Sequence, residues 1–294
     1  MNKFTKKWYI FNVFSDNLQK GYCMDRIRKR KSIRAYENVP FDVDEVRPII
    51  GRCQKSIFGN AFDIKVYSAN EAKEIGINRF SSYGAITGNP AYILATVSDE
   101  RLKLVDYGFC LENVVLELTA QGFGTCWIGN MPNKSKIERQ LGIDEIDNIP
   151  ALISVGKRNT NIKWHQKIRE KNRKEKRTFD QLFFSDFIGN PLRGSQHNMY
   201  KEIFEAIHSA PSTMNKQPWR IVIEDNNFKF YMTSDYITEQ SRWLKYIDMG
   251  IALSHFIVAI QASGKKGKWV NEVIKPLNKY EYITSFKLES DIIN

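Results

Sequence analysis

Cysteine is scarce in this chain and shows no pairing pattern. Four cysteines occur in 294 residues, at positions 23, 53, 110 and 126, and no two of them form a CxxC pair. Thiols this few and this scattered argue against the disulfide framework of a small secreted protein. A chain of this length with 42% hydrophobic residues can bury a substantial core without disulfides. A reducing environment is therefore indicated, and we expect the protein to be cytoplasmic.

Long hydrophobic runs are absent as well. Apolar stretches such as residues 256–260 are interrupted well before the roughly 18 to 20 residues that a membrane helix needs. The sequence therefore predicts a soluble protein with no membrane partner. Residues 1–23 hold an apolar cluster at 8–14 behind three lysines, but they lack the small-residue cleavage site of a signal peptide. An N-terminal extension is the simpler interpretation.

Several catalytic and cofactor motifs are missing too. No GxGxxG segment follows an expected strand, so a Rossmann dinucleotide site is not supported. The four histidines show neither HExxH spacing nor a Cys/His pattern, so we expect no metal site. No serine lies in the GxSxG setting of a hydrolase nucleophile. His208, at an expected helix end, is interpreted as a cap or surface group in preference to a substrate contact.

Positive charge dominates, and it is uneven. The net charge is +11, and residues 157–177 contain ten Lys or Arg against two Glu. Such a run can bind a nucleic-acid backbone, but no aromatic interleaving and no nucleic-acid motif accompanies it. A solvated connecting segment is the favoured interpretation, so we expect no nucleic-acid partner. A basic nucleic-acid-binding protein stays the less favoured alternative.

Two segments 142 residues apart align without a gap, namely 106–128 and 248–270. Six positions in each are identical: Asp106/Asp248, Gly108/Gly250, Leu111/Leu253, Ala120/Ala262, Gly122/Gly264 and Trp127/Trp269. Each copy predicts a helix with apolar residues at spacings of three and four, a glycine stop, and a short strand around the tryptophan. Because both helices are apolar around much of their circumference, we expect them to pack on each other at the centre of a pseudo-two-fold structure.

The remaining patterns favour an α+β fold. Residues 91–97 and 151–155 are typical of buried strands, and residues 220–232 of a hairpin that turns at 225–227. A second repeat pairs the segment at Asn60 with the segment at Asn215, with a shift of two residues. This mixture predicts a mainly antiparallel sheet flanked by helices, in two pseudo-symmetric halves of one chain.

The most informative chemistry lies in two polar segments about 180 residues apart. Arg30, Lys31, Ser32 and Arg34 offer cations and a hydroxyl, which suit a phosphate group with nearly two negative charges. The second segment, Ala-Pro-Ser-Thr-Met-Asn-Lys-Gln-Pro-Trp at 210–219, offers hydroxyl and amide groups. Each segment also has an interpretation without a ligand. The first could be an exposed basic helix end, and the second could be a helix-to-strand turn. Together they resemble the two signature segments of the nitroreductase family, whose flavin mononucleotide (FMN) lies between two subunits.

The resemblance implies a role for each residue of the first segment. Arg30 and Ser32 would hold the flavin phosphate, and Lys31 would line the ribityl chain. Arg34 would reach the pyrimidine edge of the ring. A cation at that edge favours the negative charge that appears near N1 and O2 when the ring is reduced.

The second segment matches a part of the family that comes from the neighbouring subunit. This implies flavin contacts for Pro211, Ser212 and Asn215. Gln217 and Trp219, in the same segment, are expected to be structural.

Two further stretches resemble the family. Residues 122–130 resemble the strand and loop beside the reactive edge of the ring, which implies that a backbone N–H of Gly129 or Asn130 meets flavin N5. Family members also contribute a cation to the phosphate from a later segment. Lys174, Lys176 and Arg177 are the candidates here, with the exact register left open.

The resemblance is closest to the nitroreductases in which two halves are joined in one polypeptide. Only the first half carries the basic cluster and only the second carries Pro-Ser-x-x-Asn, so one chain is expected to build one flavin site. The expected organisation begins with an N-terminal extension (1–23) and a first half (24–160). A basic connecting segment (161–186), a second half (187–272) and a C-terminal tail (273–294) follow.

The resemblance implies an FMN-dependent oxidoreductase. It would take hydride from NADH or NADPH and pass electrons to a nitroaromatic, a quinone or a similar small acceptor. No catalytic side chain is required, because the flavin supplies the chemistry while Arg34 and Gly129 tune it. A flavin-binding or storage module without turnover is the alternative. Either a monomer or a homodimer fits the sequence.

Overall fold

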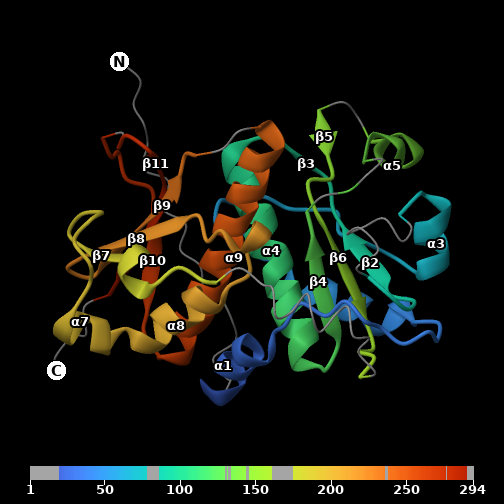
Figure 1. Ribbon diagram of the computed structural model, residues 1–294, viewed down its shortest axis with the longest axis horizontal. Helices are drawn as coiled ribbons and strands as arrows, with labels where there is room; N and C mark the ends of the chain where they lie inside the picture. Colours follow the sequence, from blue (N-terminus) through green and yellow to red (C-terminus); the bar gives the residue numbers. More distant parts are fainter. Residues whose placement is uncertain are drawn as a thin grey trace.

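The computed structural model describes residues 20–77, 86–129, 131, 134–143, 146–160, 175–235, 238–275 and 277–289. Within these ranges two long helices stand side by side at the centre, and a β-sheet lies on each side of them (Figure 1). The architecture is α+β with mainly antiparallel strand pairing, as the sequence predicts.

The first half contains a four-stranded antiparallel sheet in the order β1-β2-β6-β4. Ile93 of β2 packs into the core with α4, while Tyr92 and Leu94 pack on the other face with α3 and α5 residues. This explains why β2 has an apolar run without alternation. The elements of this half are α1 (Lys20–Lys29), η1 (Val43–Glu45), α2 (Arg47–Cys53), β1 (Lys65–Tyr67), α3 (Ala69–Glu74), β2 (Ala91–Leu94), β3 (Val97–Ser98), α4 (Arg101–Ala120), β4 (Gly124–Ile128), α5 (Lys134–Gln140), β5 (Asp147–Asn148) and β6 (Leu152–Gly156).

The second half contains a five-stranded sheet in the order β10-β11-β9-β8-β7. The β8–β9 pair is the expected hairpin, and its turn is permitted by a left-handed Asp225 with φ 52°. Strand β7 pairs with β8 in parallel, whereas the other described strand pairs of this sheet are antiparallel. The elements are η2 (Phe179–Gln181), β7 (Phe183–Ser185), α7 (Gly194–Met199), α8 (Lys201–Ser209), η3 (Thr213–Asn215), β8 (Trp219–Glu224), β9 (Asn227–Thr233), α9 (Glu239–Ala262), β10 (Gly267–Val270) and β11 (Tyr280–Leu288).

Helices α4 and α9 cross at the two aligned glycines. A Cβ added to Gly108 would lie 2.1 Å from the Ile247 carbonyl oxygen, and one added to Gly250 would lie 1.9 Å from the Val105 carbonyl oxygen. Only glycine permits so close an approach of two helix backbones. The expected packing of the two repeated helices is therefore confirmed. By length and composition α9 is apolar enough to cross a membrane, but 94% of its apolar window is buried in the protein, which is the position of a core helix.

The aligned aspartates hold equivalent loops in the two halves. Asp106 accepts a hydrogen bond from the backbone N–H of Phe58 at 3.0 Å, and Asp248 accepts one from the backbone N–H of Thr213 at 3.0 Å. Phe58 lies two residues before Asn60, and Thr213 lies two residues before Asn215. This geometry agrees with the expected pairing of the segments at Asn60 and Asn215.

Two of the expected segment boundaries do not coincide with the sheets. Strand β7 falls inside the expected connecting segment 161–186, and β11 falls inside the expected C-terminal tail 273–294. Both strands belong to the second sheet, where β11 lies between β10 and β9. The second sheet therefore extends beyond the expected second half, 187–272, at both ends. The repeat ends at Val270, so it contains no signal for a strand that begins ten residues later.

Candidate functional site

The first candidate segment leaves α1 and runs beside β4. Ser32 forms a parallel bridge with Thr125 of β4, and the Ile33 backbone N–H donates to the Thr125 carbonyl at 2.8 Å. Ile33 also covers Gly124, where a Cβ would lie 2.8 Å from its side chain. Residues 30–34 are thereby anchored along the strand that leads directly to Gly129.

The side chains of this segment differ in their surroundings. Arg30 is 8% exposed and lies 3.9 Å, through Nε, from the carboxylate of Glu112 on α4. Lys31 is exposed, while Ser32 and Arg34 are half-buried. Within the described ranges, no protein side chain pairs with Lys31 or Arg34 or bonds to the Ser32 hydroxyl. Two cations and a hydroxyl are thus available to an anionic ligand.

The second candidate segment has an unusual backbone. Met214, Asn215 and Gln217 all have positive φ, at 53°, 56° and 47°. Left-handed conformations cost free energy in residues other than glycine, so they persist only where the surrounding structure holds them. Such residues cluster at ligand sites. Ser212 contributes to that enforcement, since its hydroxyl oxygen accepts the Gln217 backbone N–H at 2.9 Å.

Gln217 and Asp248 hold this loop from inside. Gln217 is fully buried, and its side-chain amide joins the Arg177 backbone N–H at 2.7 Å to the His208 carbonyl at 3.2 Å. Asp248 accepts the Thr213 backbone N–H with both carboxylate oxygens. Burial raises the pKa of Asp248 to about 8, although the Thr213 hydrogen bonds act in the opposite direction. The structural role expected for Gln217 is confirmed.

Lys176 and Arg177 lie against the same loop. The Lys176 ammonium donates to the His208 carbonyl at 2.5 Å, and Arg177 Nε donates to the Lys216 carbonyl at 3.0 Å. The His208 ring bonds the Arg177 carbonyl and stacks on Phe179, with ring centroids 4.8 Å apart. His208 is therefore a structural group that links the segment at Arg177 to α8. Lys174 lies outside the described residues.

Gly129 follows β4 and touches α9. A Cβ at Gly129 would lie 2.8 Å from a methyl group of Leu244. Leu244 precedes Asp248 by four residues, so the two side chains share one face of α9, about one helical turn apart. Since Asp248 holds Thr213, α9 places Gly129 close to the second candidate segment. Asn130 lies outside the described residues.

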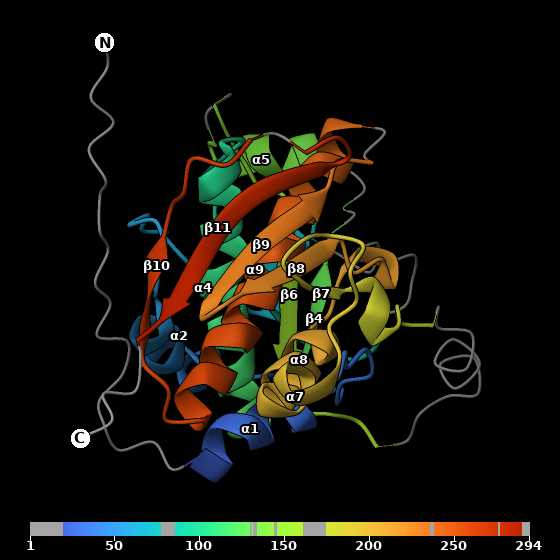
Figure 2. The ribbon, with the colours of Figure 1, turned by 90° about the vertical axis from the view of Figure 1, so that its left-hand side faces the viewer.

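A second route of contacts connects Arg30 to α8. Glu112, which lies beside Arg30, is 2.9 Å from His255 Nε2 of α9. His255 Nδ1 in turn lies 3.0 Å from the Ala206 carbonyl and 3.3 Å from the Ser209 hydroxyl, near the end of α8. Figures 1 and 2 show α1 and α8 next to each other at one end of the central helices. The candidate residues in the described ranges are thus brought to one region, although they lie far apart in the sequence.

Glu112 and His255 were not among the residues predicted from the sequence. Both are fully buried. The sequence feature that could have pointed to them is an ionisable residue in the middle of a largely apolar helix, a glutamate in α4 and a histidine in α9. Buried ionisable groups of this kind are usually paired.

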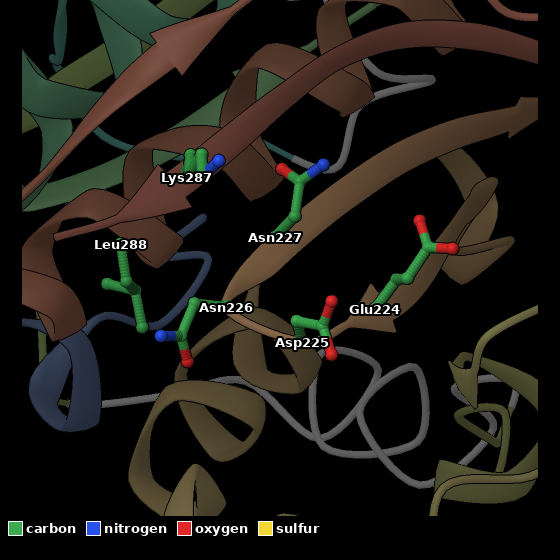
Figure 3. A pocket seen from close by; sticks show the side chains of 6 residues that line it. All are labelled: Glu224, Asp225, Asn226, Asn227, Lys287 and Leu288. Atoms are coloured by element: carbon green, nitrogen blue, oxygen red, sulfur yellow. The ribbon is translucent and has the colours of Figure 1, made fainter. Parts of the chain in front are cut away.

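A hollow of about 310 Å³ lies elsewhere, at the β8–β9 turn and the end of β11 (Figure 3). Its lining consists of Glu224, Asp225, Asn226, Asn227, Lys287 and Leu288. No candidate residue lines this hollow, so it is separate from the region described above.

Comparison with known proteins identifies the family. The family model described as "Putative TM nitroreductase" matches residues 23–260. The chain belongs to this nitroreductase family. A solved "putative nitroreductase" from Thermotoga maritima is similar over 98% of each chain, with 21% identity and a TM-score of 0.57. The expected resemblance to single-chain nitroreductases with two halves is therefore confirmed, and the fold is shared along nearly the whole chain.

Other solved nitroreductases match about half of this family member. A nitroreductase family protein from Clostridium novyi has 25% identity and a TM-score of 0.39, over 46% of this chain and 84% of its own. A nitroreductase with bound FMN from Bacteroides fragilis has 15% identity and a TM-score of 0.39, over 48% of this chain and 90% of its own. No curated protein matches the chain.

Proposed function

We propose that this protein is an FMN-dependent oxidoreductase that uses NADH or NADPH to reduce a nitroaromatic, a quinone or a similar small acceptor. Membership of the nitroreductase family supports the general class. The observation that carries the proposal is the convergence of two candidate segments on one region, with the cations and hydroxyl of Lys31, Ser32 and Arg34 unpaired by described protein groups. When bound, the flavin would supply the hydride chemistry at N5.

The donor set fits the anionic end of FMN. Arg30 and Ser32 would bind the phosphate, with Lys176 and Lys174 as further cations and Lys31 beside the ribityl chain. Charged hydrogen bonds of this kind contribute roughly 1.5 to 3 kcal/mol each. The anchoring of this segment along β4 would hold its donors in place before the ligand arrives.

The other residues would position and tune the ring. Arg34 would lie at the pyrimidine edge, and a backbone N–H of Gly129 or Asn130 would face N5. Pro211, Ser212 and Asn215 would cover the ring from the second half, in the loop whose left-handed residues are held by Gln217 and Asp248. We infer one flavin site per chain, two halves that arose by duplication, and a cytoplasmic location.

A charge reversal at Arg34 tests the cofactor assignment. Arg34 is half-buried and pairs with no described side chain, so Arg34→Glu should leave the fold intact. Loss of a charged hydrogen bond and gain of repulsion should weaken FMN binding about 10- to 150-fold. Titration of the apoprotein followed by flavin fluorescence measures this change. Arg52→Glu, at an exposed position of α2, is the matched control and should bind FMN normally. Unchanged FMN affinity in Arg34→Glu would refute the role of Arg34.

Turnover is tested separately from binding. Anaerobic addition of NADH or NADPH to the FMN-loaded protein should bleach the visible flavin absorption, and a nitroaromatic or quinone should restore it. A loaded protein that neither nucleotide bleaches would be a flavin-binding or storage module instead.

A further inference from the structure

A fully buried acid–base pair lies beneath the proposed phosphate site. Glu112 of α4 and His255 of α9 are each 0% exposed, and Glu112 Oε1 lies 2.9 Å from His255 Nε2. The other carboxylate oxygen of Glu112 accepts the indole N–H of Trp127 at 2.6 Å. The two residues are separated by 143 positions in the sequence, so the pair exists only because α4 and α9 pack together.

The partners of His255 determine where its protons lie. A carbonyl oxygen can only accept, so Nδ1 must carry the proton that it donates to the Ala206 carbonyl at 3.0 Å. On the other side of the ring, Nε2 lies 2.9 Å from Oε1 of Glu112. The pair is therefore fully hydrogen-bonded inside the core, which is the condition under which buried ionisable groups are tolerated.

Each contact of the pair leads to a different part of the proposed flavin site. Glu112 lies 3.9 Å from Nε of Arg30, the proposed phosphate ligand. Trp127 belongs to β4, two residues before Gly129. On the other side, His255 contacts Ala206 and Ser209 near the end of α8, which leads into the 211–215 loop.

The corresponding positions in the other copy of the repeat are neutral. In the gap-free alignment Glu112 matches Ser254, and His255 matches Asn113. The Asn113 amide donates to the Phe109 carbonyl of its own helix at 2.8 Å. A buried polar pair that served only the crossing of α4 and α9 would be needed equally on both sides of the pseudo-two-fold axis. Its presence only beside Arg30 argues for a role in the ligand site.

We propose that Glu112 and His255 form a positioning pair that holds Arg30 for the phosphate of the cofactor. This inference rests on the proposed function. Glu112 restrains the Arg30 guanidinium through Nε, and His255 fixes Glu112 against α8. The pair acts through Arg30 and does not itself touch the ligand, so its effect should be confined to ligands that carry a phosphate.

Comparison of FMN with riboflavin, which lacks the phosphate, tests this proposal. Glu112→Gln keeps the shape of the side chain, can still accept from Trp127 and can donate to a neutral His255, so the core should remain intact. We expect FMN binding to weaken about tenfold or more, as for the loss of an interaction with a charged group, and riboflavin binding to stay within about twofold. His255→Asn, which copies the residue at the aligned position, should show the same selectivity and serves if Glu112→Gln does not fold.

Controls separate this inference from the proposed function. Ser254→Ala, at the position aligned with Glu112, should change neither affinity. Equal weakening of FMN and riboflavin in the Glu112 and His255 variants would show a merely structural role, and unchanged affinities would show no role; either result overturns the inference. A wild-type protein that binds neither flavin would instead refute the proposed function, and the inference with it.

Discussion

The close contact between α4 and α9 makes a strong prediction for Gly250→Ala. Gly250 lies on α9 where it crosses α4, and the two helices form the centre of the molecule. The added Cβ would lie 1.9 Å from the Val105 carbonyl oxygen and 2.5 Å from the Phe109 backbone nitrogen. Both neighbours are helix backbone atoms, so no side-chain rotation can relieve the overlap.

The loss of stability can be estimated from how far the added methyl group would push the two helices apart. Restoring an ordinary contact requires the two helices to separate by about 1.5 Å at the crossing. Protein interiors are close-packed, so such a shift loosens contacts along both helices. Overpacking a core typically costs about 1 to 3 kcal/mol, and a backbone overlap of this size should cost about 3 kcal/mol or more. That is a large fraction of the roughly 5 to 15 kcal/mol that stabilises a typical protein.

Urea denaturation of wild type and variant measures this loss as a lower unfolding midpoint. Gly51→Ala is the matched control, because Gly51 lies in α2 and a Cβ there meets no atom within 4 Å. Alanine is the better helix former by about 0.5 to 1 kcal/mol, so the control should be slightly more stable than wild type. A Gly250→Ala protein with the midpoint of the wild type would refute the close crossing of α4 and α9.

Two further predictions concern the residues that hold the 211–217 loop. Because burial raises the pKa of Asp248 to about 8 in the folded protein, the folded state keeps a proton that the unfolded chain loses near pH 4. Wild-type stability should therefore fall between about pH 4 and pH 8, by at most about 1.4 kcal/mol per pH unit, and Asp248→Asn should abolish this slope. Urea midpoints at pH 5 and pH 8 measure it, and parallel changes in both proteins would contradict the assignment. Gln217→Leu should destabilise the protein by about 1 to 3 kcal/mol, because it leaves the Arg177 backbone N–H without its acceptor and removes one of the two donors to the His208 carbonyl. The exposed Gln54→Leu is its control, and equal urea midpoints for the two variants would argue against the bridging role of Gln217.

The proposed site lies between the two halves, so the packing of the central helices should affect ligand binding. Helix α4 carries Glu112, which lies beside Arg30. Helix α9 carries Leu244, which lies beside Gly129, and His255, which contacts α8. It also carries Asp248, which holds Thr213. A change at the α4–α9 crossing would therefore alter the distance between groups that we propose to bind opposite sides of one ligand. The FMN affinity of Gly250→Ala should fall together with its stability.

The sequence alone determined the local elements and the repeat. The helix periodicity, the glycine stops and the turn at 225–227 are short-range patterns, and they correctly predicted α4, α9 and the β8–β9 hairpin. The apolar circumference of both helices predicted that they pack on each other, and the structure adds that Gly108 and Gly250 permit the close approach.

Only the tertiary structure decided which distant residues meet. Nothing near Glu112 in the sequence specifies His255 as its partner, because that contact depends on how α4 and α9 cross. Strand β11 likewise follows the repeat and is placed by its pairing with β9 and β10. The local chain specifies which residue types are available, whereas the long-range packing of the two halves determines the distances between them, and a ligand site depends on those distances.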